Sequence, residues 1–175
     1  RPGMVASLAE NNEVAFRAEF DGAIVPMEQR YWRGVVFHRF DGRQWHRTDS
    51  TPRMNSQVQG GEPVDYTLFL EPHQERWVFA LDLPARAPSR WTALYRDYTI
   101  RSRRTITRKR SYEMRAYTQY QADTSDWGVA SALKIPKKGN PQARRLAADL
   151  APGTDRPEQI VSTFLAYFKD NPFVY

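Results

Sequence analysis

The sequence predicts an α+β fold: a mainly antiparallel β-sandwich or open barrel, followed by two C-terminal α-helices. Up to about residue 120, apolar and polar side chains alternate with the two-residue period of strands that bury one face. After about Trp127 the apolar residues recur at helical spacing instead. We therefore expect an antiparallel β domain over residues 1–130 and a helical segment over residues 131–175.

The first strands are predicted by alternation and by turn residues. Residues 14–20 alternate apolar and polar side chains and end at Asp21-Gly22. Residues 31–47 are typical of a hairpin whose halves meet through Asp41-Gly42, a dipeptide that accepts the positive φ angles of a type I′ turn. Residues 49–63 are polar and rich in glycine and proline, which indicates an exposed loop.

The second half of the β domain contains three further predicted strand regions. Residues 66–70 and 76–81 are rich in β-forming side chains, and a proline-containing connection follows at 84–89. From residue 91 to 120, even positions hold most of the apolar side chains, while odd positions hold Arg101, Arg103, Lys109 and Arg115. This pattern predicts a long two-stranded ribbon that bends near residues 102–105.

Two helices are predicted near the C-terminus. Asn140-Pro141 offers a cap and a first-turn proline for a helix that Pro152-Gly153 ends. Residues 155–158 are typical of a capping box for a second helix, which Asn171-Pro172 ends. The second helix carries an apolar stripe made of Ile160, Val161, Phe164, Leu165 and Phe168. Because residues 173–175 are apolar and no polar terminus follows, we expect the sequence to stop inside a larger unit.

The positive charge is concentrated in one segment. The chain has a net charge of +6, and residues 90–115 contain nine cations and two anions, a local +7 that leaves −1 elsewhere. The ribbon is therefore a candidate surface for an anion or a partner, formed by Arg101, Arg103, Arg104, Arg108, Lys109 and Arg110. A solvated or domain-packing strand pair is the simpler interpretation of the same residues. Nucleic acid is a disfavoured ligand.

The sequence contains no residue pattern that is typical of a catalytic site. With no cysteine, the chain can form no disulfide, no Cys-ligated metal centre and no thiolate nucleophile. In the predicted hairpin Phe40 faces Arg43, which puts His38 and His46 on opposite faces, and His73 falls in a predicted turn. No paired carboxylates, nucleophile elbow or phosphate-binding loop is evident. We expect no catalytic site, cofactor or metal in this chain.

The tryptophans are spread over five segments. An exposed group of them would form a sugar platform, but their separation favours core and interface packing. The residues concerned are Trp32, Trp45, Trp77, Trp91 and Trp127.

Several motifs, taken together, resemble a known family. They are Tyr31-Trp32-Arg33-Gly34, residues 40–45, Glu71-Pro72 and residues 77–84. In this order they are similar to the N-terminal extracytoplasmic region of TgpA-type transglutaminase-like membrane proteins of bacteria. The C-terminal residues from Asn140 onward resemble the helical lead-in to the transglutaminase core of that family.

The resemblance implies a parent protein anchored in the bacterial inner membrane, with this chain as a soluble part of its periplasmic segment. It implies a non-catalytic domain that supports or regulates a transglutaminase-like acyltransferase core. The catalytic cysteine, histidine and aspartate of the family lie beyond the position of Tyr175. The resemblance implies that this chain contacts the C-terminal core of the parent chain. It also implies protein substrates for the parent.

Two other functions remain open. A periplasmic polyanion or glycan binding module would use the basic ribbon of residues 90–115. Alternatively, apolar strand or helix surfaces would dock another protein.

Overall fold

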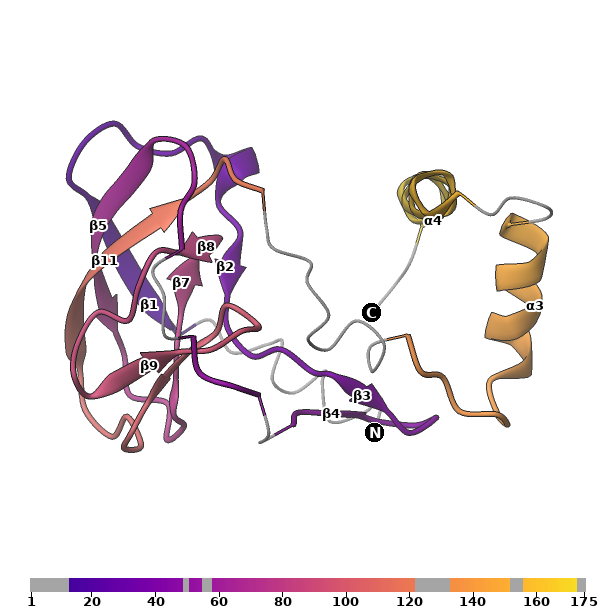
Figure 1. The fold of residues 1–175 in the computed structure, drawn as a ribbon, viewed down its shortest axis with the longest axis horizontal. Helices are drawn as coiled ribbons and strands as arrows, with labels where there is room; N and C mark the ends of the chain where they lie inside the picture. The colour runs from indigo at the N-terminus through magenta and orange to yellow at the C-terminus, as the bar shows by residue number, and fades with distance from the viewer. Residues whose placement is uncertain (1–12, 49–50, 55–57, 122–132, 152–155, 173–175) are drawn as a thin grey trace. The chain divides into compact units, whose positions relative to one another are not determined.

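The computed structural model of the chain describes residues 13–48, 51–54, 58–121, 133–151 and 156–172 (Figure 1). They fall into two compact units. The larger unit comprises Asn12–Phe40 and Trp45–Lys134, and the smaller one contains α3 (Pro141–Leu150) and α4 (Pro157–Asp170). The predicted domain boundary at residue 130 lies outside the described residues. No helix in the described ranges is both long and apolar enough to cross a bilayer.

The larger unit is built from antiparallel sheets, which confirms the predicted fold class. A four-stranded sheet has the order β1 (Phe16–Phe20), β5 (Pro63–Leu70), β11 (Arg110–Tyr117) and β8 (Leu83–Pro84). A three-stranded sheet has the order β6 (Trp77–Val78), β10 (Ile100–Ser102) and β9 (Thr92–Leu94). Two shorter pairs join β2 (Trp32–Arg33) to β7 (Ala80–Leu81), and β3 (Arg39–Phe40) to β4 (Trp45–His46). A short 3₁₀ helix, η1 (Met27–Gln29), follows β1.

One hydrophobic core lies between these sheets. Strand β5 is paired on both sides, with β1 and β11, and its alternate residues Tyr66, Leu68 and Leu70 are fully buried. They pack in one cluster with residues of the three-stranded sheet and of β7, among them Val78, Leu81, Leu94 and Ile100. The apolar side chains that recur at every second residue therefore face an interior shared by the sheets, as a sandwich requires.

A buried tyrosine links this core to the shorter strands. The Tyr66 hydroxyl accepts a hydrogen bond of 2.8 Å from the backbone N–H of Leu81. Burial raises the pKa of Tyr66, so the phenol is neutral at any physiological pH. The bond holds β7 against β5 because a buried amide left without a partner would be costly.

Strand pairing brings together two of the sequence motifs. Strands β2 and β7 pair Trp32 with Leu81, and the Asp82 N–H donates to the Tyr31 carbonyl at 2.7 Å. The Arg33 Nε donates to the Asp82 carbonyl at 3.0 Å, and the Tyr120 hydroxyl donates to Asp82 Oδ1 at 2.7 Å. Residues 31–34 and 77–84 therefore act as one structural element.

The hairpin of β3 and β4 has a different register from the predicted one. Phe40 pairs with Trp45 and Arg39 with His46, so the prediction that Phe40 faces Arg43 was wrong. The turn occupies Asp41–Gln44, and its positive φ of 105° falls on Gly42. Asp41 Oδ1 accepts from the backbone N–H groups of Arg43 and Gln44, at 2.9 and 2.8 Å, and this side-chain cap stabilises a four-residue loop in place of the predicted two-residue loop.

The prediction of one two-stranded ribbon over residues 91–120 is also wrong. Strands β9 and β10 form a short hairpin around Tyr98, whose φ is +58°, whereas β11 belongs to the other sheet. Residues 103–109 cross between the two sheets, and Ile106 is buried midway, with its N–H donating to the Glu75 carbonyl at 2.8 Å. The even-numbered apolar residues still reach one common core. Ile100 enters it from the three-stranded sheet, and Met114 and Ala116 enter it from the four-stranded sheet.

Both predicted helices are present. Asn140 is not a conventional cap, however, because it has left-handed backbone angles and its Nδ2 donates to the Gly42 carbonyl at 3.1 Å. The predicted capping box begins at Asp155, outside the described residues, as do residues 173–175. None of the described residues of α3 or α4 is buried.

The hydrogen bond of Tyr66 gives a first prediction. Replacing Tyr66 with Phe removes the acceptor of the buried Leu81 N–H and should lower the free energy of unfolding by about 1–2 kcal/mol. Urea unfolding followed by circular dichroism measures this loss. Tyr31→Phe, at an exposed tyrosine, is the control and should change stability little; equal losses in both variants would contradict the prediction.

Candidate anion-binding groove

The six predicted surface cations come from three different parts of the larger unit. Arg101 lies in β10, and Arg110 is the first residue of β11. The other four lie in the connection of residues 103–109 and are exposed, namely Arg103, Arg104, Arg108 and Lys109. Because β10 and β11 belong to different sheets, these cations do not form one continuous row.

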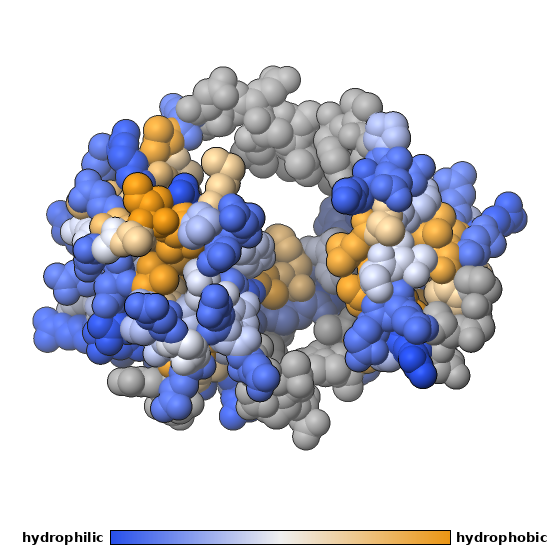
Figure 2. Space-filling model, turned by 90° about the horizontal axis from the view of Figure 1, so that it is seen from above, coloured by the Kyte–Doolittle hydropathy of each residue, from blue (hydrophilic) through white to orange (hydrophobic). Residues whose placement is uncertain are grey.

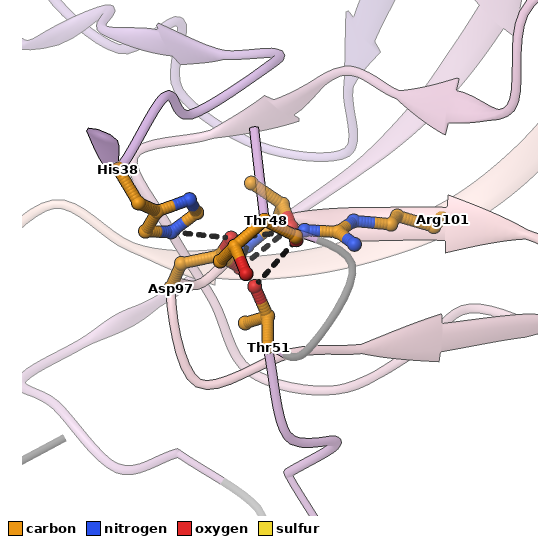
Figure 3. Close-up of polar contacts among 6 residues, drawn as sticks. His38, Thr48, Thr51, Asp97 and Arg101 are labelled. Atoms are coloured by element: carbon orange, nitrogen blue, oxygen red, sulfur yellow. Dashed lines mark hydrogen bonds and ion pairs between the residues drawn. The ribbon is translucent and has the colours of Figure 1, made fainter. Parts of the chain in front are cut away.

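Arg101 is committed to an internal ion pair (Figure 3). Its Nη2 donates to Asp97 Oδ2 at 3.1 Å, and its guanidinium stacks over the Tyr95 ring at 4.3 Å from the centroid. The side chains of Arg101 and Asp97 are only 12% and 3% exposed. A guanidinium this enclosed is not available to an external anion.

Asp97 organises a small polar cluster around itself. Its Oδ1 accepts from the Thr99 hydroxyl at 2.6 Å and from the Thr99 N–H at 3.1 Å. Figure 3 shows His38 and Arg101 approaching the carboxylate from opposite sides, and His38 Nε2 lies 3.2 Å from Oδ2. The cluster thus connects the segment before β3 to the hairpin of β9 and β10.

Lys109 is partly neutralised. Its Nζ lies 3.0 Å from Glu71 Oε1, which also accepts from Arg17 Nη1 at 3.2 Å. This three-residue bridge lies on the outer surface of the four-stranded sheet, where ion pairs are exposed and weak. Lys109 therefore contributes less free charge than the sequence suggested.

Two of the remaining cations line a groove, here called the basic groove. Its volume is about 620 Å³, and its lining includes Ser89, Trp91, Arg104, Thr105, Arg110 and Glu113. Arg104 and Arg110 form no ion pair with any acid in the described part of the chain. Buried Ile106 and half-buried Tyr112, whose pKa is raised by burial, also line it. The structure thus brings together two of the six predicted residues.

Backbone contacts hold the walls of the basic groove in place. The Trp91 N–H donates to Ser89 Oγ at 3.2 Å, and the Thr92 hydroxyl donates to the Ser89 carbonyl at 2.8 Å. The Arg103 N–H donates to the Trp91 carbonyl at 2.8 Å, and the Arg104 N–H donates to Ser102 Oγ at 3.2 Å. The groove is therefore preorganised.

Trp91 departs from the packing role that the sequence indicated. Its side chain is 51% exposed, and the guanidinium groups of Arg90 and Arg104 lie over its ring at 5.0 and 5.8 Å from the centroid. Trp45 is also exposed, whereas Trp32 and Trp77 are half-buried and Trp127 lies outside the described residues. The sequence places Trp91 beside the cations of the basic segment, but the separation of the tryptophans favoured a packing role for it.

The side chains of His38 and His73 are both largely shielded from solvent. The His38 side chain is 12% exposed. His73 has both ring nitrogens shielded, and its ring stacks on Trp77 at 5.3 Å between centroids. Among the described residues, no group of three or more His, Cys, Asp or Glu side chains could hold a metal ion.

Comparison with known proteins identifies close relatives. A family model described as the TgpA N-terminal domain matches residues 1–123. A protein-glutamine gamma-glutamyltransferase of Pseudomonas aeruginosa is 32% identical over 182 residues, which cover 99% of this chain and 26% of the relative. The chain therefore spans about a quarter of that relative's length.

Two crystal structures from the same organism share the fold. The periplasmic domain of TgpA matches with a TM-score of 0.88 and 30% identity, over 99% of this chain and 61% of that one. The same domain bound to ethylmercury matches with a TM-score of 0.83 and 32% identity, over 98% and 62%. Both matches extend through nearly the whole chain.

The Asp97 cluster yields a stability prediction. Asp97→Asn removes the negative charge that Arg101 faces in a nearly enclosed site, and should lower the free energy of unfolding by about 3 kcal/mol. The matched control is Asp65→Asn, which breaks the Arg115–Asp65 pair on the surface and should cost much less. Urea unfolding compares them, and similar losses would refute the assignment.

His73 predicts a pH dependence of stability. Desolvation lowers the pKa of His73, so the folded state favours the neutral ring and the unfolded state takes up a proton more readily. Stability should therefore fall as the pH falls from about 7 to about 5. His73→Phe keeps an aromatic ring next to Trp77 but does not titrate, so the decrease in urea midpoint should shrink. An unchanged decrease would show that other groups cause it.

Proposed function

Because the chain belongs to the TgpA N-terminal domain family, we propose that it is a non-catalytic domain that supports the transglutaminase core of a longer bacterial membrane protein. The observation that carries this proposal is the extent of the structural match. The fold corresponds over 99% of this chain but covers only 61% of the TgpA periplasmic domain. The remainder of such a domain is where we place the catalytic core.

The chemistry of the reaction supports a division of labour. The curated relative is named a protein-glutamine gamma-glutamyltransferase. In a transglutaminase, an activated thiolate attacks the carbonyl carbon of the glutamine amide and releases ammonia, which leaves a thioester. An amine then attacks the thioester, forms the new amide and releases the thiolate. This chain contains no cysteine, so such a nucleophile would have to come from another part of the protein. We propose the periplasm as its compartment, because the similar crystal structure is that of a periplasmic domain.

The helices offer the surface through which this support would act. On α4, the apolar stripe is incompletely covered, with Val161, Leu165 and Phe168 each more than half exposed. Figure 2 shows hydrophobic side chains at the surface of the helical unit. An amphipathic helix gains most of its stability by packing this face against a partner. We assign that partner to the transglutaminase core of the parent chain.

The alternative function, a polyanion-binding ribbon, is less well supported. Arg101 and Lys109 pair with Asp97 and Glu71, and the cations are divided between two sheets. Affinity for a polyanion depends on many unpaired cations along one track.

A charge introduced into the α4 stripe tests the proposal. In the longer protein with its natural C-terminal continuation, Leu165→Glu should reduce amine incorporation into a glutamine substrate at least tenfold, because the charge would be buried against the core. Ala166→Glu adds the same charge one residue later on the opposite face and should retain activity. In the 175-residue chain alone, both variants should have similar urea midpoints, because both positions are exposed there.

Two outcomes would refute the proposal. One is a longer protein that incorporates no amine and contains no Cys-His-Asp arrangement. The other is equal activity of the Leu165→Glu and Ala166→Glu variants, which would show that this face of α4 does not contact the core.

A further inference from the structure

We propose that the basic groove binds a saccharide that carries a carboxylate group. The groove combines three features that such a ligand would use: unpaired guanidinium groups, an exposed tryptophan on a fixed backbone, and several hydroxyl-bearing side chains. Each feature recognises a different part of the ligand. All of them belong to the larger unit, so the inference does not depend on the role proposed for the helices.

The guanidinium groups select for an anion. Arg104 and Arg110 both line the groove, and neither forms an ion pair with an acid among the described residues. A guanidinium binds a carboxylate through two parallel hydrogen bonds, which fixes its orientation as well as its position. Glu113 is the acidic residue in the lining, so the local net charge is +1. This balance suits a ligand with few charges.

Trp91 provides a flat apolar surface beside these charges. Its backbone is held by hydrogen bonds to Ser89 and Arg103, yet about half of its side chain is exposed. A rigid exposed tryptophan presents a large contact area at little cost in conformational entropy, and the C–H face of a sugar ring packs on such a surface. The contact between Arg104 and the ring is an exposed cation–π interaction, which is weak enough for the guanidinium to turn towards a ligand carboxylate.

The remaining polar residues suit a ligand with many hydroxyl groups. Thr105 and Ser111 line the groove and make no hydrogen bond through their hydroxyls to other described residues. Each hydroxyl both donates and accepts, and the Glu113 carboxylate accepts. Sugar hydroxyls can use all of these groups, because they both donate and accept.

The size of the groove separates a saccharide from a nucleic acid. A volume of about 620 Å³ is in the range of small-ligand sites, which suits a short saccharide. Nucleic acid binding without sequence preference depends on a basic track with several stacking aromatic residues. The basic groove has one exposed tryptophan and two lining cations, which favours the short acidic saccharide.

Binding to the 175-residue chain tests the inference by isothermal titration calorimetry. The probes are trigalacturonic acid and a disaccharide containing N-acetylmuramic acid, which represent acidic polysaccharide and cell-wall sources of a carboxylated hexose. Galactotriose and chitobiose are their neutral counterparts, and a thymidine oligonucleotide and a tetraglutamate peptide represent other anions. At least one acidic saccharide should bind, at least tenfold more tightly than its neutral counterpart and than either other anion.

Matched variants locate the site. Trp91→Ala, Arg104→Ala and Arg110→Ala should each weaken binding about tenfold, the usual effect of losing one charge-assisted or stacking contact. Trp45→Ala and Arg108→Ala remove an equally exposed tryptophan and an exposed arginine away from the groove lining, and should stay within twofold of the wild type. Urea midpoints confirm that each variant is folded.

The inference is overturned if neither acidic saccharide binds at millimolar concentration, or if the neutral, peptide or oligonucleotide probes bind as well. It is also overturned if the control variants weaken binding as much as the groove variants. Because the assay uses no transglutaminase core, either result leaves the proposed support function untouched, and the activity assay of the longer protein does not bear on the groove.

Discussion

The burial of one face of β5 is the constraint on which the larger unit depends. Tyr66, Leu68 and Leu70 are enclosed because β5 is paired on both sides and the three-stranded sheet covers its inner face. The Tyr66 hydroxyl accepts a hydrogen bond from β7 and so holds β7 against β5. Strand β7 in turn pairs with β2, which joins residues 31–34 to residues 77–84. Connections between the sheets, including residues 103–109, are positioned by the same core.

The basic groove follows from that arrangement. Ile106 inserts into the core and holds the connection of residues 103–109 between the sheets. The flanking residues Arg104 and Arg110 thereby line the same groove as Trp91, which precedes β9. A single cluster of buried apolar residues thus sets the geometry of a polar surface site. The Asp97 cluster acts in the opposite way, because it removes Arg101 from the surface.

The two units have different energetic characters, and this underlies the two proposals. The larger unit buries its own core and carries the basic groove within itself, so the binding proposed for the groove needs no second unit. The helices bury none of their described residues, and α4 leaves its apolar stripe exposed. A surface of this kind is stabilised by a partner, which agrees with a relative whose periplasmic domain is longer than this chain.

The sequence by itself determined the α+β class, the two helices, the family and the absence of a thiol nucleophile, because periodicity, motif order and composition are local properties. Only the tertiary structure decided the hairpin register, the division of residues 91–120 between two sheets and the positions of the cations. Alternation shows which side chains share a face but not which strand pairs with which. For that reason the six clustered cations of the sequence are divided among one largely enclosed ion pair (Arg101), one surface bridge (Lys109), two groove residues (Arg104 and Arg110) and two further exposed arginines (Arg103 and Arg108). Trp91, whose spacing favoured a packing role, lines the groove instead.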